Sequence, residues 1–245
     1  MFKQLLASVG IGAAKVDTVL LTDQLLPGQQ FQAEIIIRGG EVEQHIQGLE
    51  LALMTRMKVE SGDNHYYSAL ALARWHLADR FSIGPGQEKR LQFKGQLHPE
   101  TPITELPVRN NQTAVWLATG LSVDNALDPS DKDRLFIKAP ELVSRVIQAM
   151  DELGLKLVKA DVEKGYVNAR TFRSSTGCYQ ELEFRPKGFG LFSINEVELS
   201  FVCEAGQTHV LIELDRAFRR DGFQALTFPN TSSVAELKQR LQALL

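Results

Sequence analysis

The 245-residue sequence has little of what marks several common classes of protein. Its two cysteines are too few to staple a secreted domain and fit a reducing compartment. Lysine and arginine number 27 against 30 aspartate and glutamate, so the chain lacks the basic surplus of a nucleic-acid-binding protein. No apolar run reaches the roughly 20 residues of a membrane span, and residues 1–14 make a poor signal peptide. These absences predict a cytoplasmic protein with no nucleic-acid partner and disfavour membrane contact.

Patterns that carry catalysis or hold metals are also missing. No two of the histidines have the spacing of two or four residues that places a pair of ligands on one zinc ion; they are His45, His65, His76, His98 and His209. The glycines at 10 and 12 lack the remainder of a dinucleotide or phosphate-binding loop, and no Gly-x-Ser-x-Gly turn occurs. We therefore expect no enzyme, no catalytic residue and no cofactor.

Two pairs of reactive side chains are better explained by structure than by a redox or catalytic role. Cys178 and Cys203 lie in neighbouring candidate strands and are interpreted as a fortuitous buried pair, since a redox couple favours Cys-x-x-Cys. Glu181 and Glu183 alternate with apolar residues, which is typical of the solvent-facing side of a strand rather than of an acid–base pair.

The first half of the chain is dominated by apolar residues at every second position. This period-two pattern predicts strands with one buried face, seen most clearly in Phe31, Ala33, Ile35 and Ile37, in Leu49, Leu51 and Leu53, and in Val115, Leu117, Leu121 and Val123. Weaker strand signals occur at residues 15–22, 66–76 and 89–97, and turns rich in glycine and proline separate them. Short strands between frequent turns predict an antiparallel β-sandwich.

The second half combines strands with two predicted helices. Pro140 and Gly154 bracket a helix over residues 141–153, and Ser233 with Glu236 forms a capping box that starts a final helix running to residue 245. Strands are predicted at residues 155–162, 166–172, 179–185, 194–203 and 208–215. We therefore predict two β-rich domains, 1–127 and 134–245, joined by an acidic linker at 128–133.

Four aspartates gather where the two predicted domains meet: Asp124, Asp128, Asp131 and Asp133. Calcium takes six to eight oxygen ligands, so a calcium site is one interpretation of this cluster. The alternative is a solvated acidic linker, which we expect because the spacing of a calcium-binding loop is absent.

Three segments are candidate surfaces for a partner. They are an amino-terminal amphipathic arm with Phe2, Leu5, Leu6 and Val9, a basic cluster of Arg216, Arg219 and Arg220, and a carboxyl-terminal seam of Val234, Leu237, Leu241 and Leu244. The arm and the seam are each also explained by docking on the chain's own core, and the cluster by solvation. A homodimer contact is the alternative for the seam.

At the level of continuous strings the chain resembles the bacterial sporulation-control protein family. The resemblance rests on LASVGIGAAKVDT at residues 6–18, on residues 25–56, on HPETPIT at 98–104 and on VWLATGLSVDNALDPSDKD at 115–133. It is looser in NEVELSFV at 195–202 and IELDRAFRRDGF at 212–223. The resemblance implies two tandem arrestin-like antiparallel β-sandwiches, an intracellular location, a regulatory or scaffolding role without catalysis, and partners in the cell-shape or division machinery.

The leading prediction is a mainly β, non-enzymatic regulator that binds protein partners. Exposed sheet edges offer a mechanism, because an extended peptide can pair with them main chain to main chain. The alternatives are a small-ligand carrier or weak hydrolase that uses a groove between the domains, and a peripheral membrane-associated adaptor. A deep polar pocket would favour the carrier, and a shallow surface with open edges would favour the adaptor.

Overall fold

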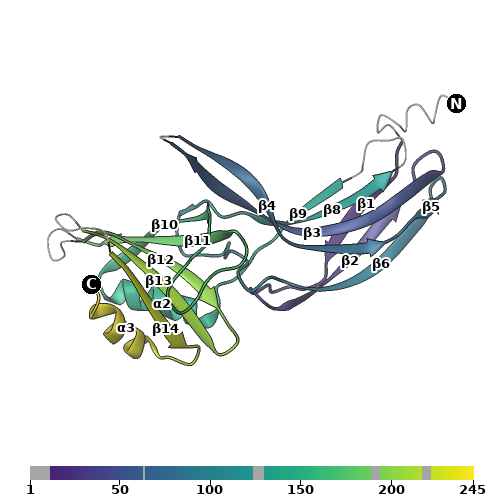
Figure 1. Ribbon diagram of the computed structural model, residues 1–245. Coiled ribbons are helices and arrows are strands. Elements are labelled where there is room, and N and C mark those ends of the chain that lie inside the picture. The colour runs from purple at the N-terminus through teal and green to yellow at the C-terminus, as the bar shows by residue number, and fades with distance from the viewer. Residues whose placement is uncertain (1–11, 63, 124–129, 189–193, 217–221) are drawn as a thin grey trace.

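The computed structural model describes residues 12–62, 64–123, 130–188, 194–216 and 222–245 (Figure 1). The first half of the chain forms two antiparallel layers. One layer is a three-stranded sheet in the order β1 (Lys15–Leu20), β2 (Gln30–Arg38) and β6 (Glu88–Gln96). The other contains β3 (Gln44–Ser61), β4 (Asn64–Ala78), β5 (Phe81–Ile83), β8 (Val115–Val123) and β9 (Ser130–Arg134).

The second half is an antiparallel sheet with helices on one side (Figure 1). Its strands follow the order β14 (Gly222–Pro229), β13 (Gln207–Arg216), β12 (Ile194–Cys203), β11 (Cys178–Pro186) and β10 (Leu155–Lys164). The helices are α2 (Glu141–Glu152) and α3 (Val234–Gln242). The mainly β fold, with these two helices among the described residues of the second half, is the predicted fold class, and it is confirmed.

The predicted alternation places the apolar residues in two main regions of core. In the first half Phe31, Ala33, Ile35 and Ile37 of β2 are at most 1% exposed and face the buried leucines of β3 and β8. In the second half the apolar stripe of α2 packs on the sheet together with Leu237 and Leu241 of α3. Burial of this apolar surface supplies the main favourable term in folding.

Local signals explain where the two helices begin and end. Pro140 precedes the first turn of α2, and the chain leaves the helix through Gly154, whose φ of 85° favours glycine. Ser233 and Glu236 form the predicted capping box at the start of α3. No helix among the described residues is long and apolar enough to cross a membrane.

The chain passes between the halves more than once. After β6 it runs through residues 97–114 to the second half, where β7 (Asn110–Asn111) pairs with Lys159 and Ala160 of β10, and it then returns as β8. It leaves the first half again between β9 and α2. β10 also pairs with β3 through one parallel bridge, between Glu163 and Lys58.

Several sequence predictions need correction against this arrangement. Residues 130–133 of the predicted linker belong to β9, which pairs with β8, so the alternating Asp131, Lys132 and Asp133 are strand residues. The predicted strand at 166–172 forms only the isolated bridge between Asn168 and Arg173. β14 was not predicted. The division into independently folding domains stays a prediction.

An acidic face as the candidate functional site

The sheet of the second half has one apolar face and one acidic face. Leu182, Phe184, Val197 and Leu199 point into the core beneath α2 and α3. Successive side chains of a strand point to opposite faces of the sheet. The residues that alternate with the core residues therefore lie on the opposite face, and seven of them are carboxylates. This acidic face consists of Asp161 and Glu163 of β10, Glu181 and Glu183 of β11, Glu196 and Glu198 of β12, and Glu213 of β13.

The strand register sets like charges directly opposite one another. Asp161 pairs with Glu181, Glu183 with Glu198, and Glu198 with Glu213. Like charges in directly opposed positions destabilise a sheet. Four strands therefore hold an arrangement that sheet stability alone does not favour.

Three cations offset part of this repulsion, mainly on one side of the face. Lys58 Nζ lies 2.9 Å from Glu163 Oε1, and Lys159 Nζ lies 2.8 Å from Asp161 Oδ2. Arg185 contacts Glu183 at 2.7 Å and Glu196 at 2.9 Å. Within the described part of the chain, no lysine or arginine comes within ion-pair distance of Glu181 or Glu198.

The electrostatics of the unpaired centre follow from burial. Burial, with repulsion from Glu198 and Glu163, raises the pKa of Glu181 to about 8. Burial, with repulsion from Glu213 and Glu196, raises the pKa of Glu198 to about 7. Burial also raises the pKa of Glu163, although its hydrogen bond from Lys58 acts in the opposite direction. Glu181 and Glu198 therefore titrate near neutral pH.

Aromatic side chains border the centre of the face. A hollow of about 290 Å³ opens over Glu181, Glu198 and Glu213, and Tyr166, Tyr179 and Phe223 also line it. We call this the acidic hollow. Phe223 is 62% exposed, so its ring is open to a visiting group. Tyr166 is 51% exposed, and the guanidinium group of Arg173 lies over its ring at 5.0 Å from the centroid. A second hollow of about 400 Å³ continues past Tyr179 to Lys58 and Glu60.

This combination of groups suits a cation. Aromatic faces attract ammonium and guanidinium groups, and carboxylates bind them through charge-assisted hydrogen bonds. The oxygen atoms of Asp161, Glu163 and Glu181 also lie within 4.8 Å of one another, as metal ligands do. Lys159 and Lys58 already pair with two members of that trio, so an organic cation at the acidic hollow fits the side chains better than a metal ion.

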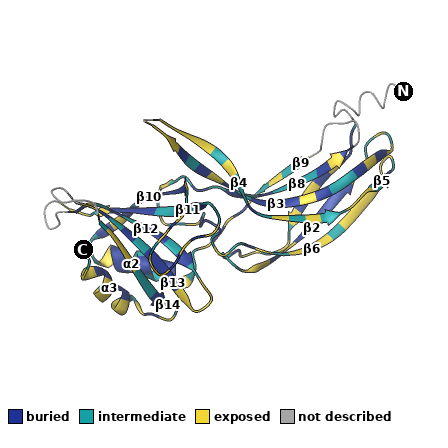
Figure 2. Cartoon of the chain, in the orientation of Figure 1, coloured by how far each residue is buried: buried dark blue, intermediate teal, exposed yellow. Residues whose placement is uncertain are grey.

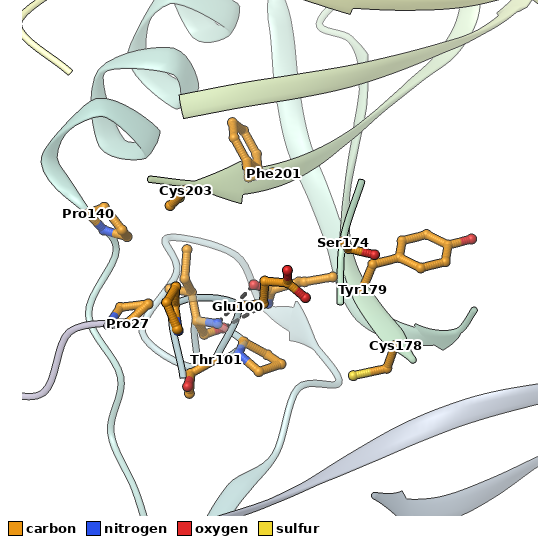
Figure 3. Close-up of a pocket in the computed structure, with 13 residues that line it drawn as sticks. Pro27, Glu100, Thr101, Pro140, Ser174, Cys178, Tyr179, Phe201 and Cys203 are labelled. Carbon is orange, nitrogen blue, oxygen red and sulfur yellow. Dashed lines mark hydrogen bonds between the residues drawn. The ribbon is translucent and has the colours of Figure 1, made fainter. Parts of the chain in front are cut away.

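The boundary between the halves holds a different kind of space. A groove of about 490 Å³ is lined by Gly28, Gln29, Pro140, Glu204 and Asn230 among others, with only Glu141 and Glu204 bearing charge. Beside it a cavity of about 30 Å³ lies among prolines and the two cysteines (Figure 3). That volume holds about one water molecule. This joint therefore offers no set of converging titratable groups.

Hydrogen bonds and burial give the joint a structural role. The backbone N–H and hydroxyl groups of Ser175 and Thr176 all donate to the carboxylate of Glu100, at 2.9–3.1 Å. Burial raises the pKa of both Cys178 and Cys203 to about 11, so both thiols are protonated and poorly nucleophilic at neutral pH. Cys178 is buried and Cys203 is half-buried, so the expectation of a fortuitous buried pair is met at Cys178 and only in part at Cys203.

The predicted calcium candidates are only partly in the described chain. Asp124 and Asp128 lie outside it. Asp131 and Asp133 stand on β9 beside Asp17 of β1, and Asp131 Oδ2 accepts a hydrogen bond from Thr18 N at 2.8 Å. Burial raises the pKa of Asp133 to about 7. Asp131 and Asp133 are thus part of the sandwich rather than of a solvated linker, and the calcium interpretation is untested.

Of the three predicted partner surfaces, only the carboxyl-terminal seam lies entirely within the described residues. Phe2, Leu5, Leu6 and Val9 lie outside the described residues, as do Arg219, Arg220 and the side chain of Arg216. Leu237 and Leu241 are 0% and 1% exposed, and Val234 and Leu244 pack against the same core. The carboxyl-terminal seam is therefore used within the chain, which corrects its interpretation as a surface for a partner.

The acidic face was missed because its signal is divided among strands. The patterns Glu-Leu-Glu-Phe at 181–184 and Glu-Val-Glu-Leu at 196–199 each resemble an ordinary solvent-facing strand. Only the register shows that their glutamates oppose one another and share a hollow. The interpretation of Glu183 as solvent-facing is wrong, since this residue is 8% exposed.

Comparison with known proteins places the chain in a family. The family model described as SpoOM protein matches residues 2–218. This chain belongs to the Spo0M family. The sporulation-control protein Spo0M of Bacillus subtilis is 33% identical over 219 residues, which cover 89% of this chain and 81% of that protein.

The solved structure of a Spo0M protein agrees with the fold. The crystal structure of Bacillus subtilis Spo0M superposes with a TM-score of 0.83 at 27% identity, covering 96% of this chain and 98% of that one. The region that matches the Spo0M family model extends through β13 and so includes every carboxylate of the acidic face, whereas β14 and α3 lie beyond it.

Proposed function

We propose that this Spo0M-family chain is a regulator in sporulation control that has no catalytic role and binds a positively charged segment of a protein partner. A lysine or arginine side chain enters the acidic hollow between Tyr166, Tyr179 and Phe223. Its charge then lies beside Glu181 and Glu198. The sporulation role is supported by the kinship with Bacillus subtilis Spo0M.

One observation carries the binding proposal. Glu181 and Glu198 are half-buried, have raised pKa values and form no ion pair with a lysine or arginine of the described chain. The lysines that line the adjoining hollow, Lys58, Lys159 and Lys164, leave both carboxylates without an ion pair. Strongly perturbed carboxylates in a hollow are typical of functional sites. An incoming cation relieves their repulsion, and this differential interaction favours the bound state.

The proposal sets a direction for the pH dependence. Below pH 6 Glu181 and Glu198 are mostly protonated, so the hollow has little charge to offer a cation. Between about pH 6 and 9 both groups ionise, and a lysine-containing ligand binds more tightly. Added salt weakens the binding because it screens the exposed charges of the peptide and the face.

A fluorescent peptide of alternating lysine and glycine provides the test, by anisotropy at pH 8. The double variant Glu181→Gln with Glu198→Gln is expected to weaken binding at least tenfold. The matched control, Glu141→Gln with Glu152→Gln, removes the same charge from α2 on the other side of the sheet and should change affinity less than twofold. Equal weakening by both pairs would show nonspecific attraction and contradict the proposal.

The regulatory part is tested separately in cells. A Bacillus subtilis strain that lacks its Spo0M is complemented with this chain or with the double variant, and sporulation frequency is counted. We expect the native chain to restore sporulation and the double variant to fail at equal protein level. Equal rescue by both would remove the acidic face from the mechanism.

The small-ligand alternative has weaker support. The groove between the halves has the volume for a ligand, but its charged groups are only Glu141 and Glu204. Ligand sites combine an apolar cavity with converging polar groups. The acidic hollow has that convergence to a greater degree.

A further inference from the structure

The outer edge of β4 carries a second interaction surface, independent of the acidic face. β4 is 15 residues long and, within the described chain, its backbone pairs only with β3. β3 pairs with β8 as far as Thr55 and with β10 at Lys58, so beyond Lys58 the strands β3 and β4 form a two-stranded arm. The arm stands away from both halves in Figure 1, and Figure 2 shows its tip as largely exposed.

The composition of this edge sets it apart from a protected one. Residues 64–73 contain no Asp, Glu, Lys, Arg, Pro or Gly. Natural edge strands are usually blunted by charges, proline or a covering element, because unpaired N–H and C=O groups attract another strand. A long uncharged edge is therefore one that accepts a partner strand.

Other edges of the same molecule show the usual protection. β6 carries Glu88, Lys89, Arg90 and Lys94 along its length. β14 is also uncharged, but it ends in Pro229, and Arg240 of α3 donates a hydrogen bond to the carbonyl of Thr227 at 2.8 Å. β4 has no proline, and its one lysine or arginine among the described residues, Arg74, lies just beyond residues 64–73.

We propose that the partner of this edge is the β4 strand of a second copy of the chain, paired antiparallel about a two-fold axis near Ala69. Such pairing joins each edge to an identical edge, as in an isologous dimer. Because each chain contributes one such edge, association stops at two copies.

The side chains of the segment complement themselves when two copies run antiparallel. Its first half carries His65, Tyr66 and Tyr67, and its second half carries Ala69, Ala71 and Ala73. An axis at Ala69 sets His65 against Ala73, Tyr66 against Leu72 and Tyr67 against Ala71, so each aromatic side chain meets an apolar residue of the other copy. Tyr66 and Tyr67 are 54% and 44% exposed in the single chain, so they have surface to bury.

Charge favours the same occupant. A strand with net charge repels its own copy in antiparallel pairing, since like charges meet across the axis. Residues 64–73 carry no acidic or lysine and arginine side chains, so two copies approach without that repulsion. A strongly charged partner strand would gain nothing here, whereas a second β4 meets no penalty.

The test is sedimentation over a range of concentrations with three proteins. The native chain is expected to reach twice its monomer mass. Ala69→Lys places a charge at an exposed position on the axis and should weaken association at least tenfold. The matched control, Ala225→Lys, puts the same side chain at an exposed position of β14 and should leave it unchanged.

Hydrogen exchange of the native chain locates the contact without any substitution. Amides of residues 64–73 should exchange more slowly as the concentration rises through the association range. A native chain that stays monomeric at its highest soluble concentration overturns the proposal. So does a dimer that survives Ala69→Lys when circular dichroism shows the variant folded, or one that protects other segments and not 64–73.

Discussion

The two faces of the β10–β13 sheet are built from alternating residues of the same strands, yet burial has opposite effects on them. Leu182 and Phe184 are 0% exposed beneath the helices, where burial contributes about 25 cal/mol per Å² of apolar surface. Glu181 and Glu183, their neighbours in the chain, have raised pKa values because burial disfavours their charges. The stability of this sheet therefore comes from one face, while the other is kept at a cost in stability that the proposed binding role would explain.

The largest expected effect is on the apolar face. Phe184→Ala removes a fully buried ring from the core and should lower the free energy of unfolding by about 3–5 kcal/mol. Urea unfolding at pH 8 measures it. The folded fraction of the variant should retain its affinity for the lysine peptide. A loss below about 1 kcal/mol would mean that this face contributes less to stability than its packing indicates.

A smaller loss is expected where the acidic face depends on a cation. Lys58→Ala leaves Glu163, whose side chain is 11% exposed, without its ion pair, and should cost about 1–3 kcal/mol at pH 8. The loss should shrink at low pH, where protonated Glu163 needs no cation. Adding Glu163→Gln to the variant should recover most of the stability. No recovery would show that the lysine acts through packing alone.

A third substitution is expected to have the opposite sign, raising stability. Glu181 has a folded-state pKa of about 8, against about 4.3 for an unfolded glutamate. Its contribution to stability is present below the unfolded value and is lost as the pH rises through 8. Glu181→Gln should therefore raise the melting temperature at pH 9 and leave it unchanged at pH 4. A lower melting temperature at pH 9 would contradict the sign.

A buried acid of the first half serves as the control for this comparison. The pKa of Asp133 is raised to about 7, chiefly by burial, and the residue sits on β9 beside Asp131 and Asp17. Asp133→Asn should also raise stability at pH 9, but it should not alter binding of the lysine peptide. Comparing the two substitutions thus separates the loss of stability caused by a partly buried carboxylate from its contribution to peptide binding.

Sequence periodicity predicted those strands and helices that bury one face and expose the other. The alternation from Phe31 to Ile37 and the apolar stripe of the helix after Pro140 both appear in the structure as predicted. The prediction failed at residues 130–133, where a polar strand at a sheet edge has the composition of a linker. The strand predicted at residues 166–172 was also wrong, but here the composition favours a strand. In the structure these residues lie in a loop and form only one isolated bridge, between Asn168 and Arg173.

The candidate site depended on information that no local pattern carries. Each glutamate of β11, β12 and β13 fits an exposed strand position when taken alone. Their mutual approach is set by pairings such as Glu183 with Glu198, which join residues on different strands. Strand register, rather than composition, turns these ordinary residues into one surface.

The route of the chain between its halves has a mechanical consequence. Residues 97–114 cross to the second half and return, and the chain crosses again between β9 and α2, so three covalent tethers join the two bodies. A protease that cuts one tether leaves two intact, and the nicked molecule should still migrate as one particle. Any relative movement of the halves must be compatible with all three connections at once.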